Sequence, residues 1–163
     1  MGSDIEPTIF WTAVGKRPIG ATVVTSQGSN GPMGFLALSF AHVSSAPPTV
    51  LVSASKMTTA LKAILESQNF AVSVLAAGGQ PLAQAFGRSG DMAARFALAE
   101  WDRLVTGAPI LRQAAAVFDC TLKQTIEEGS TVILVGAVTG LRLSGAKGAT
   151  LAYRNGFRDF VAD

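Results

Sequence analysis

The apolar residues of this 163-residue chain are gathered into short runs, and this spacing constrains the fold more than any other feature. The runs are rich in valine, alanine and leucine, and glycine, proline and serine separate them. None approaches the roughly 20 apolar residues that a membrane-spanning helix needs. Short apolar runs bounded by turn-forming residues are typical of β-strands, so the chain is expected to be rich in strands.

Two of these runs, residues 19–26 and 33–40, flank the turn-forming segment QGSNGP and predict an antiparallel hairpin. Further strands are expected at residues 49–54, 70–75, 117–124, 132–143 and 150–153. About seven strands favour a closed or partly closed β architecture over an alternating βαβ fold.

Only two segments predict helices. Apolar residues at 60, 61, 64 and 65 form a helical stripe, for which Ser55 or Thr58 is a candidate cap. Residues 81–86 form a second short helix pattern that begins with proline. Residues 87–113 show weak periodicity and are expected to be loops with short helical pieces. Because no repeat or linker interrupts the chain, residues 1–163 are expected to form one domain.

Composition excludes several classes of protein. Hydrophobic residues make up 48% of the chain and charged residues 15%, which excludes a disordered protein. The net charge of +2 is small and the basic residues are scattered, so nucleic acid is not an expected partner. The beginning, MGSDIEPTIFW, lacks a basic segment followed by an apolar stretch. A cytoplasmic protein that does not bind membranes is therefore expected.

Cys120 is the only cysteine and His42 the only histidine. A single cysteine excludes an intrachain disulfide and a cysteine-based metal cage. A single histidine removes most metal sites and the usual serine–histidine–aspartate triad, so no metal is expected. His42 is assigned a structural role or a place at a cofactor edge. If the chain is an enzyme, a bound organic cofactor is expected to carry the chemistry.

Three segments are candidate binding sites. In residues 53–59, SASKMTT, several hydroxyls and Lys56 precede a helix and would suit a phosphate, although helix capping explains them as well. Residues 34–44 are rich in small side chains that would let a flat ring approach the backbone. In residues 86–91, Arg88 would face a phosphate or a subunit interface. Local evidence alone favours a cap, a buried strand and a solvated turn, respectively.

The order of the motifs resembles that of the short-chain flavin reductases, the reductase partners of two-component flavin monooxygenases. The resemblance covers residues 10–160 and is carried by F10-x-x-A-x-G15-x-x-P18-I-G-A-T-V-V-T25, residues 34–44, P47-P-x-V-L-V52, F70-A-V-x-V-L75, F86-G-R-S-G-D91, R95-F96, W101, G107-A-P-I-L111, C120 and Y153-R-N-G-F-R158.

The resemblance implies a mainly β fold: a Greek-key, FMN-binding split barrel with a few short helices. It also implies a homodimer whose flavin, FMN or FAD held without a covalent bond, lies near the subunit interface. Reduced nicotinamide, NADH or NADPH, would donate hydride to the flavin, and the reduced flavin would pass to a partner monooxygenase.

Residue by residue, the resemblance places Ala37, Leu38 and Ser39 beside the isoalloxazine ring. It assigns the phosphate-binding turn to Ser53, Ser55, Lys56, Thr58 and Thr59, and it places Arg88, Phe157 and Arg158 near a cleft shared by two subunits. No side chain is assigned a catalytic acid or base role.

The chain also departs from the family pattern. Leu36 and Leu38 stand where the family has hydroxyl side chains, and Ala60 replaces a threonine of the phosphate turn. Residues 129–131, GST, replace a Gly-Asp-His sequence, and the closing segment has no histidine. The last two departures affect the nicotinamide site more than the flavin site.

An NAD(P)H-dependent flavin reductase is therefore the function that the sequence favours. Two alternatives remain open at this point. One is a flavoprotein electron carrier, or a reductase of another acceptor such as a corrinoid. The other is a flavin-binding module without catalytic activity.

Overall fold

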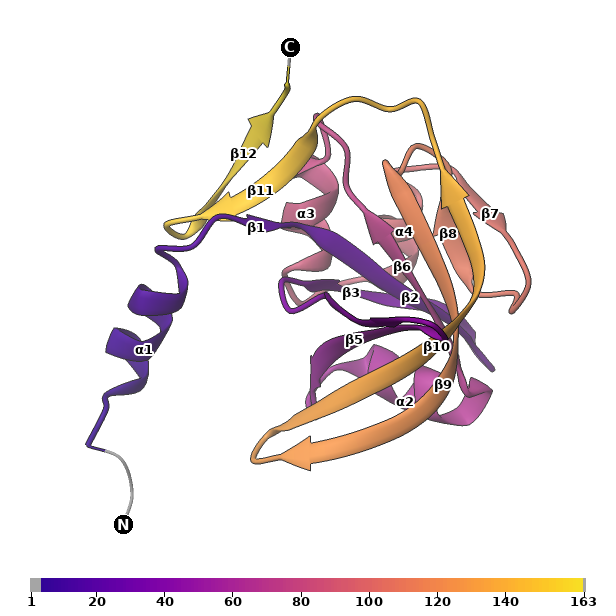
Figure 1. The fold of residues 1–163 in the computed structure, drawn as a ribbon, viewed down its shortest axis with the longest axis horizontal. Helices are drawn as coiled ribbons and strands as arrows, with labels where there is room; N and C mark the ends of the chain where they lie inside the picture. The colour runs from indigo at the N-terminus through magenta and orange to yellow at the C-terminus, as the bar shows by residue number, and fades with distance from the viewer. Residues whose placement is uncertain (1–3, 163) are drawn as a thin grey trace.

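The computed structural model describes residues 4–162, and antiparallel strands dominate it (Figure 1). Seven strands form one sheet in the order β3-β2-β6-β9-β10-β5-β4. Their bounds are β2 Thr22–Gly28, β3 Gly31–Ala37, β4 Ala41–Ser45, β5 Pro48–Ser55, β6 Asn69–Val74, β9 Ala116–Glu128 and β10 Thr131–Leu143.

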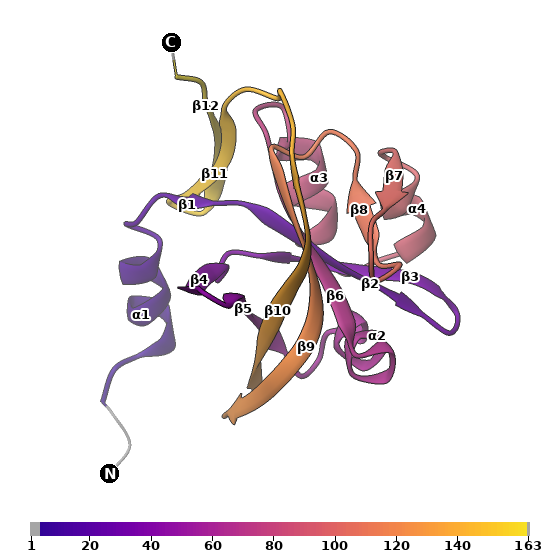
Figure 2. The same ribbon diagram turned by 45° about the vertical axis from the view of Figure 1, so that its right-hand side comes forward.

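Two smaller sheets complete the strand structure. In the first, β11 (Ala149–Tyr153) lies between β1 (Ile19–Gly20) and β12 (Gly156–Phe160). The second pairs β7 (Trp101–Arg103) with β8 (Pro109–Leu111). Because β1 runs almost directly into β2, the first small sheet lies at one end of the large one (Figures 1 and 2).

Hairpins set the register of the large sheet. β2 and β3 join through a tight turn at Gly28 and Gly31, as the segment QGSNGP predicts. β9 and β10 form a hairpin of two 13-residue strands that closes at Gly129, whose φ of +55° suits glycine. β10 also pairs with β5, so that Ser55 lies opposite Thr131. This pairing brings the hairpin tip to the end of β5 (Figure 2).

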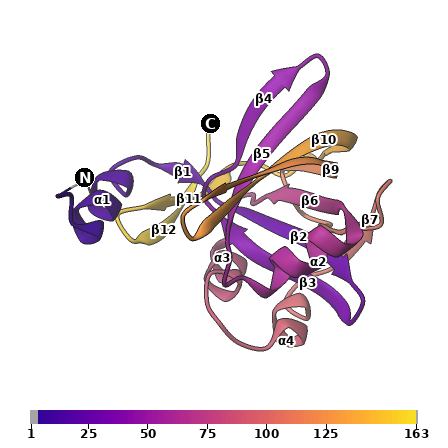
Figure 3. The ribbon, with the colours of Figure 1, turned by 90° about the horizontal axis from the view of Figure 1, so that it is seen from below.

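Buried apolar side chains form two clusters against the sheet, here called the first and the second core, and helices cover both. On one side, α2 (Thr59–Ser67) buries Leu61 and Ile64 against the strands. On the other side, α3 (Gln80–Phe86) and α4 (Met92–Phe96) bring Phe86 and Phe96 against Trp101 of β7. In Figure 3 the β4–β5 hairpin extends away from these three helices.

A glycine allows the closest packing inside the sheet. A Cβ atom at Gly136 of β10 would lie 2.5 Å from the Phe70 ring and 2.9 Å from the Cys120 Cβ atom. Only a residue without a side chain lets β10 pass over this fully buried ring. The same burial raises the pKa of the Cys120 thiol to about 12, so the thiol stays neutral well above physiological pH.

The first helix, α1 (Pro7–Val14), stands apart from the sheet (Figures 1 and 3). None of its residues is buried, and Ile9, Phe10 and Trp11 are all more than half exposed. An apolar helix that covers no core within its own chain is unusual in a folded domain.

The mainly β architecture with a few short helices agrees with the split-barrel prediction. All seven predicted strands form, and both predicted helices form as α2 and α3. Thr58 is the N-cap of α2, but its side chain makes no capping hydrogen bond. The prediction missed α1 and the short strands β4, β7, β8 and β12, and the described residues hold twelve strands and four helices in all. Among residues 4–162, no helix is long and apolar enough to cross a membrane.

Candidate functional site

A cavity of about 820 Å³ lies where five parts of the chain meet. It is bounded by α1 and the segment that follows it, the end of β3, the end of β5, the tip of the β9–β10 hairpin and the β11–β12 turn. The residues that line it are Trp11, Val14, Gly15, Arg17, Ile19, Leu36, Ala37, Leu38, Ser39, Ser53, Ser55, Ser130, Thr131, Ala152, Tyr153, Arg154, Asn155, Gly156 and Phe157.

The end of β3 and the neighbouring strand β5 supply one wall. Strand alternation sends Val52 and Ala54 of β5 into the core and presents Ser53 and Ser55 to the cavity. The Ser39 hydroxyl ties the two segments together, because it accepts a 2.8 Å hydrogen bond from the Ser53 N–H. It also lies 3.4 Å from the Ser53 carbonyl oxygen, to which it donates. The Ser39 hydroxyl therefore shapes the wall, because its hydrogen bonds to the Ser53 backbone hold the two segments together.

The hairpin tip supplies the polar end of the cavity. The Lys56 N–H donates to the Ser130 carbonyl at 2.9 Å, which holds the tip against the turn after β5. Ser55, Ser130 and Thr131 all line the cavity here. The three hydroxyl side chains, together with backbone N–H groups at a turn, are suitable donors to an anion.

A close ion pair lies beside this polar end. The Lys56 Nζ atom is 2.7 Å from the Glu127 Oε2 atom on β9. The hydrogen bond and the positive charge of Lys56 hold the pKa of the Glu127 carboxyl below its usual value. Glu127 is thus ionised at neutral pH. Its carboxylate pairs with the ammonium group of Lys56, which the resemblance assigns to a phosphate.

The β11–β12 turn forms the opposite wall. Arg154 and Asn155 both have positive φ angles, +47° and +61°, which fold the chain back within two residues. The Arg154 N–H donates to the Gly15 carbonyl at 3.0 Å, so this turn is attached to the end of α1. The Arg154 guanidinium lies 5.1 Å from the centre of the Tyr153 ring, within the range of a cation–π contact.

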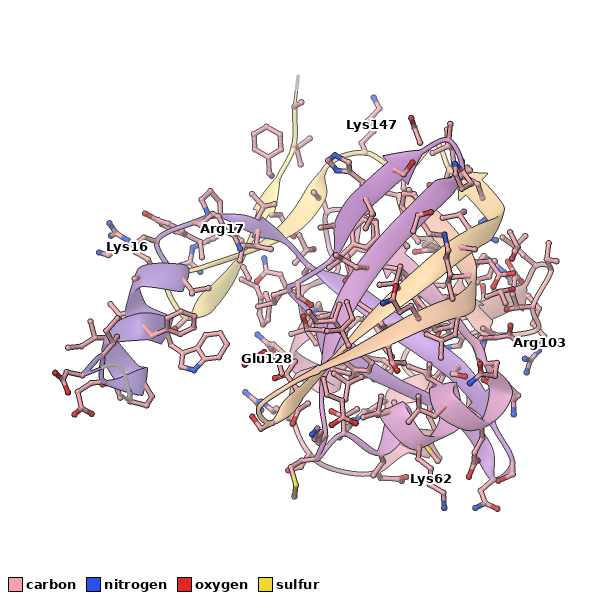
Figure 4. The ribbon with its side chains drawn as sticks, turned by 60° about the horizontal axis from the view of Figure 1, so that its bottom comes forward. Lys16, Arg17, Lys62, Arg103, Glu128 and Lys147 are labelled. Carbon is pink, nitrogen blue, oxygen red and sulfur yellow. The ribbon has the colours of Figure 1, made fainter. Side chains whose placement is uncertain are left out.

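The segment after α1 brings positive charge to the same region. Arg17 lines the cavity, and Figure 4 shows Lys16 and Arg17 together where α1 leads into β1. Among the described residues, no carboxylate lies within 4.0 Å of Arg17 or Arg154. The cavity therefore has hydroxyls at one end and, along another wall, two guanidinium groups that pair with no carboxylate of residues 4–162.

Six of the predicted cofactor residues line this cavity: Ala37, Leu38, Ser39, Ser53, Ser55 and Phe157. The other five lie outside the lining. Lys56 pairs with Glu127, and Thr58 and Thr59 begin α2. Arg88 follows α3, where its carbonyl accepts a hydrogen bond from Arg95. The Arg158 guanidinium donates to the carbonyl of Phe157.

With the exception of Phe157, the sequence assigned no role to the residues that the N-terminal segment, the hairpin tip and the β11–β12 turn contribute to the lining. The N-terminal segment and the β11–β12 turn both belong to motifs that carried the family resemblance. That resemblance was the signal that could have identified their residues. His42 lies on β4, where it is exposed and outside the cavity lining.

Size and chemistry together define what the cavity can hold. Its volume falls within the roughly 300–1,000 Å³ of small-molecule sites. One wall combines small and apolar side chains, Leu36, Ala37 and Leu38, with the edge of a strand, which suits a flat aromatic ring. The hydroxyls at the far end suit a phosphate. This arrangement suits a ligand that joins a flat ring to a phosphate, as a flavin nucleotide does.

Comparison with known proteins gives a consistent family. The model of the flavin reductase like domain matches residues 14–160. The FMN reductase (NADH) RutF of Bradyrhizobium diazoefficiens is 33% identical over 142 residues, which cover 87% of this chain and 79% of that protein.

Solved structures agree with this result. The NADH:FAD oxidoreductase SgcE6 of Streptomyces globisporus C-1027 has a TM-score of 0.88 and 30% identity, and the match covers 99% of both chains. BorF, the flavin reductase component of a bacterial two-component tryptophan halogenase, has a TM-score of 0.87 and 30% identity. That match covers 97% of this chain and 100% of BorF.

Proposed function

The chain belongs to the flavin reductase like domain family, and from this membership we propose that it is an NAD(P)H-dependent flavin reductase. It passes hydride from reduced nicotinamide, NADH or NADPH, to FMN or FAD held without a covalent bond. The observation that carries the proposal is the convergence of the end of β3 and the turn after β5 on one cavity of about 820 Å³. The relatives named for NADH-dependent reduction of FMN and of FAD support it.

In this proposal the flavin ring lies along Ala37, Leu38 and Ser39, and Phe157 faces it from the β11–β12 side. Its phosphate end lies at Ser53 and Ser55, joined by the hairpin residues Ser130 and Thr131. The bound flavin supplies the group that accepts and returns the hydride. The protein has to hold the ring, orient the nicotinamide against it and exclude water, and these tasks require no side-chain acid or base.

Arg88, Arg158, Thr58 and Thr59 stay predicted contacts. They lie outside the cavity lining of a single chain, so any role in the site requires the ligand or a second subunit to reach them. Lys56 is a separate case because its ammonium group already has a partner.

Rapid mixing of the flavin-loaded protein with NADH or NADPH tests the reaction directly. We expect the oxidised flavin absorption to bleach, with a rate that saturates as the nicotinamide concentration rises. Loss of the reduced flavin to free solution would agree with a reductase that supplies a partner. Reduced flavin that stays bound would instead indicate an electron carrier. Flavin binding without any bleaching would contradict the proposal and favour a non-catalytic flavin-binding module.

The acceptor of the reduced flavin is proposed to be a partner monooxygenase. BorF, which serves a two-component halogenase, supports this assignment by its similarity over nearly the whole chain. A reductase of this kind needs a cavity that releases its flavin, and a cavity with hydroxyl side chains and no covalent anchor meets that need.

A homodimer whose flavin site is completed by the second subunit is the last part of the proposal. Its support is the exposed apolar surface of α1 and of the short segment before it, where Ile5, Ile9, Phe10 and Trp11 are all more than half exposed. Trp11 also lines the cavity, so a subunit that covers α1 would come close to the flavin. Two-fold pairing is the commonest way for such a surface to be covered.

Replacement of Ile9 with glutamate is expected to convert the dimer to a monomer and to weaken flavin binding, because a carboxylate would then lie in the apolar contact. Sedimentation at micromolar concentration measures the mass. The matched control is Leu65→Glu, which places the same group on an exposed position of α2, away from α1 (Figures 1 and 3). A wild-type protein that sediments as a monomer and binds flavin fully would contradict the dimer.

A further inference from the structure

The turn after β5 and the tip of the β9–β10 hairpin form one structural unit at the polar end of the cavity. Ser55 pairs with Thr131 in the sheet, and the Lys56 N–H donates to the Ser130 carbonyl at 2.9 Å. Ser55, Ser130 and Thr131 line the cavity from these two segments. A charge carried by either segment therefore acts on the same end of any ligand in the cavity.

Each segment carries a charge of opposite sign, and the two charges neutralise each other. The Lys56 Nζ and Glu127 Oε2 atoms are 2.7 Å apart, and their side chains are 41% and 71% exposed. Such an exposed ion pair is weak, because water and salt screen it. A phosphate group carries nearly two negative charges and offers three strong acceptor oxygens. It therefore competes well with a single carboxylate for one ammonium group.

We propose that Glu127 is a built-in competitor for Lys56, which the phosphate of a bound flavin nucleotide displaces. Glu127 is then a specificity-determining residue: it sets how much more tightly the site binds a phosphorylated flavin than riboflavin, which has no phosphate. This inference rests on the proposed function, since it takes the phosphate end of the flavin to lie at Ser55.

The opposite role for Glu127 has a different signature. If Glu127 held Lys56 in the position that the phosphate needs, removal of its charge would free the lysine and weaken nucleotide binding. A competitor has the reverse effect, because its removal makes the ammonium group available. The sign of the change in FMN affinity thus separates the two roles.

The test is a fluorescence titration of wild type and Glu127→Gln with FMN and with riboflavin at low salt. We expect Glu127→Gln to bind FMN roughly two- to fivefold more tightly, the range for loss of a weak exposed pair, and to bind riboflavin unchanged. The gain should shrink as salt is raised. In the double variant Lys56→Gln/Glu127→Gln it should be absent relative to Lys56→Gln.

Glu128→Gln is the matched control. Figure 4 shows Glu128 at the tip of the same hairpin, and its replacement changes the net charge equally without touching Lys56. We expect it to leave both affinities unchanged. FMN binding that is unchanged or weaker in Glu127→Gln, or an equal gain in Glu128→Gln, would overturn the inference while flavin binding by the wild type still stood. A wild type that binds neither flavin would overturn the proposed function together with it.

Discussion

Replacement of Ser53 with tryptophan should lower flavin affinity by about 100-fold or more, which corresponds to ~2.8 kcal/mol or more of binding free energy. Ser53 lies on β5 and points into the cavity, while its neighbours Val52 and Ala54 point into the core. An indole at this position would fill the space between the end of β3 and the hairpin tip. The flavin ring could then no longer lie along Ala37–Ser39.

The fold should survive this change. Ser53 makes its structural contacts through the backbone: its N–H donates to Ser39, and it pairs with Ile133 of β10. Both contacts are independent of the side chain, and an open cavity accepts a larger side chain without overpacking the core. Thermal unfolding should therefore stay close to that of the wild type.

Ser53→Ala is the control at the same position. It removes one hydroxyl without adding volume, so FMN affinity should fall by about tenfold at most, the upper value of one neutral hydrogen bond. Titration with FMN, read by fluorescence or by the shift of the flavin absorption band, measures both variants. Wild-type affinity in the tryptophan variant would show that the flavin binds outside this cavity.

The strands of the large sheet follow from local patterns in the sequence. The segment QGSNGP and its two flanking apolar runs predicted the β2–β3 hairpin, and the apolar runs at residues 117–124 and 132–143 predicted β9 and β10. These features depend on turn chemistry and on short-range hydrophobic pattern, both of which a single sequence displays.

The elements that the sequence did not predict lack such patterns for identifiable reasons. α1 has no buried residue, so no apolar stripe marks one of its faces. β7 and β8 have three residues each, too few for alternation to show. β12 begins after a turn in which Arg154 and Asn155, and not glycine, hold positive φ angles. Arginine is not among the residues that favour a positive φ, so the first position of this turn gave no signal.

Only part of the candidate site could be predicted, because some of its contacts join residues that are far apart in the sequence. Ser53, Ser55 and Ala37–Ser39 were identified because they lie in continuous segments that resemble the family. The contact between Lys56 and Glu127 joins residues 71 positions apart, and the pairing of β5 with β10 brings them together. Register between distant strands is a property of the whole sheet, so the lysine was predicted as a free cation.

Asp119 is a further residue to which the sequence drew no attention, although it is fully buried. One carboxylate oxygen accepts hydrogen bonds from the Val105 and Thr106 N–H groups, both at 2.8 Å. The other accepts from the Thr106 hydroxyl. These three bonds attach the loop between β7 and β8 to β9 in the middle of the large sheet. That loop leads into β8, whose Ile110 and Leu111 are part of the second core.

Asp119→Ala should therefore destabilise the fold by about 3 kcal/mol, because it leaves three part-buried donors without the acceptor that they share. For a chain of this size the melting temperature should fall by roughly 6–12 °C. Asp119→Asn is the matched variant: its amide oxygen can keep both backbone bonds, and its NH₂ group can donate to the Thr106 oxygen, so a loss of about 1 kcal/mol is expected. Urea unfolding at a fixed protein concentration measures both. Equal losses of unfolding free energy in the two variants would show that the negative charge, and not the geometry of the acceptors, anchors the loop. A loss well below about 1 kcal/mol in Asp119→Ala would show that water replaces the carboxylate.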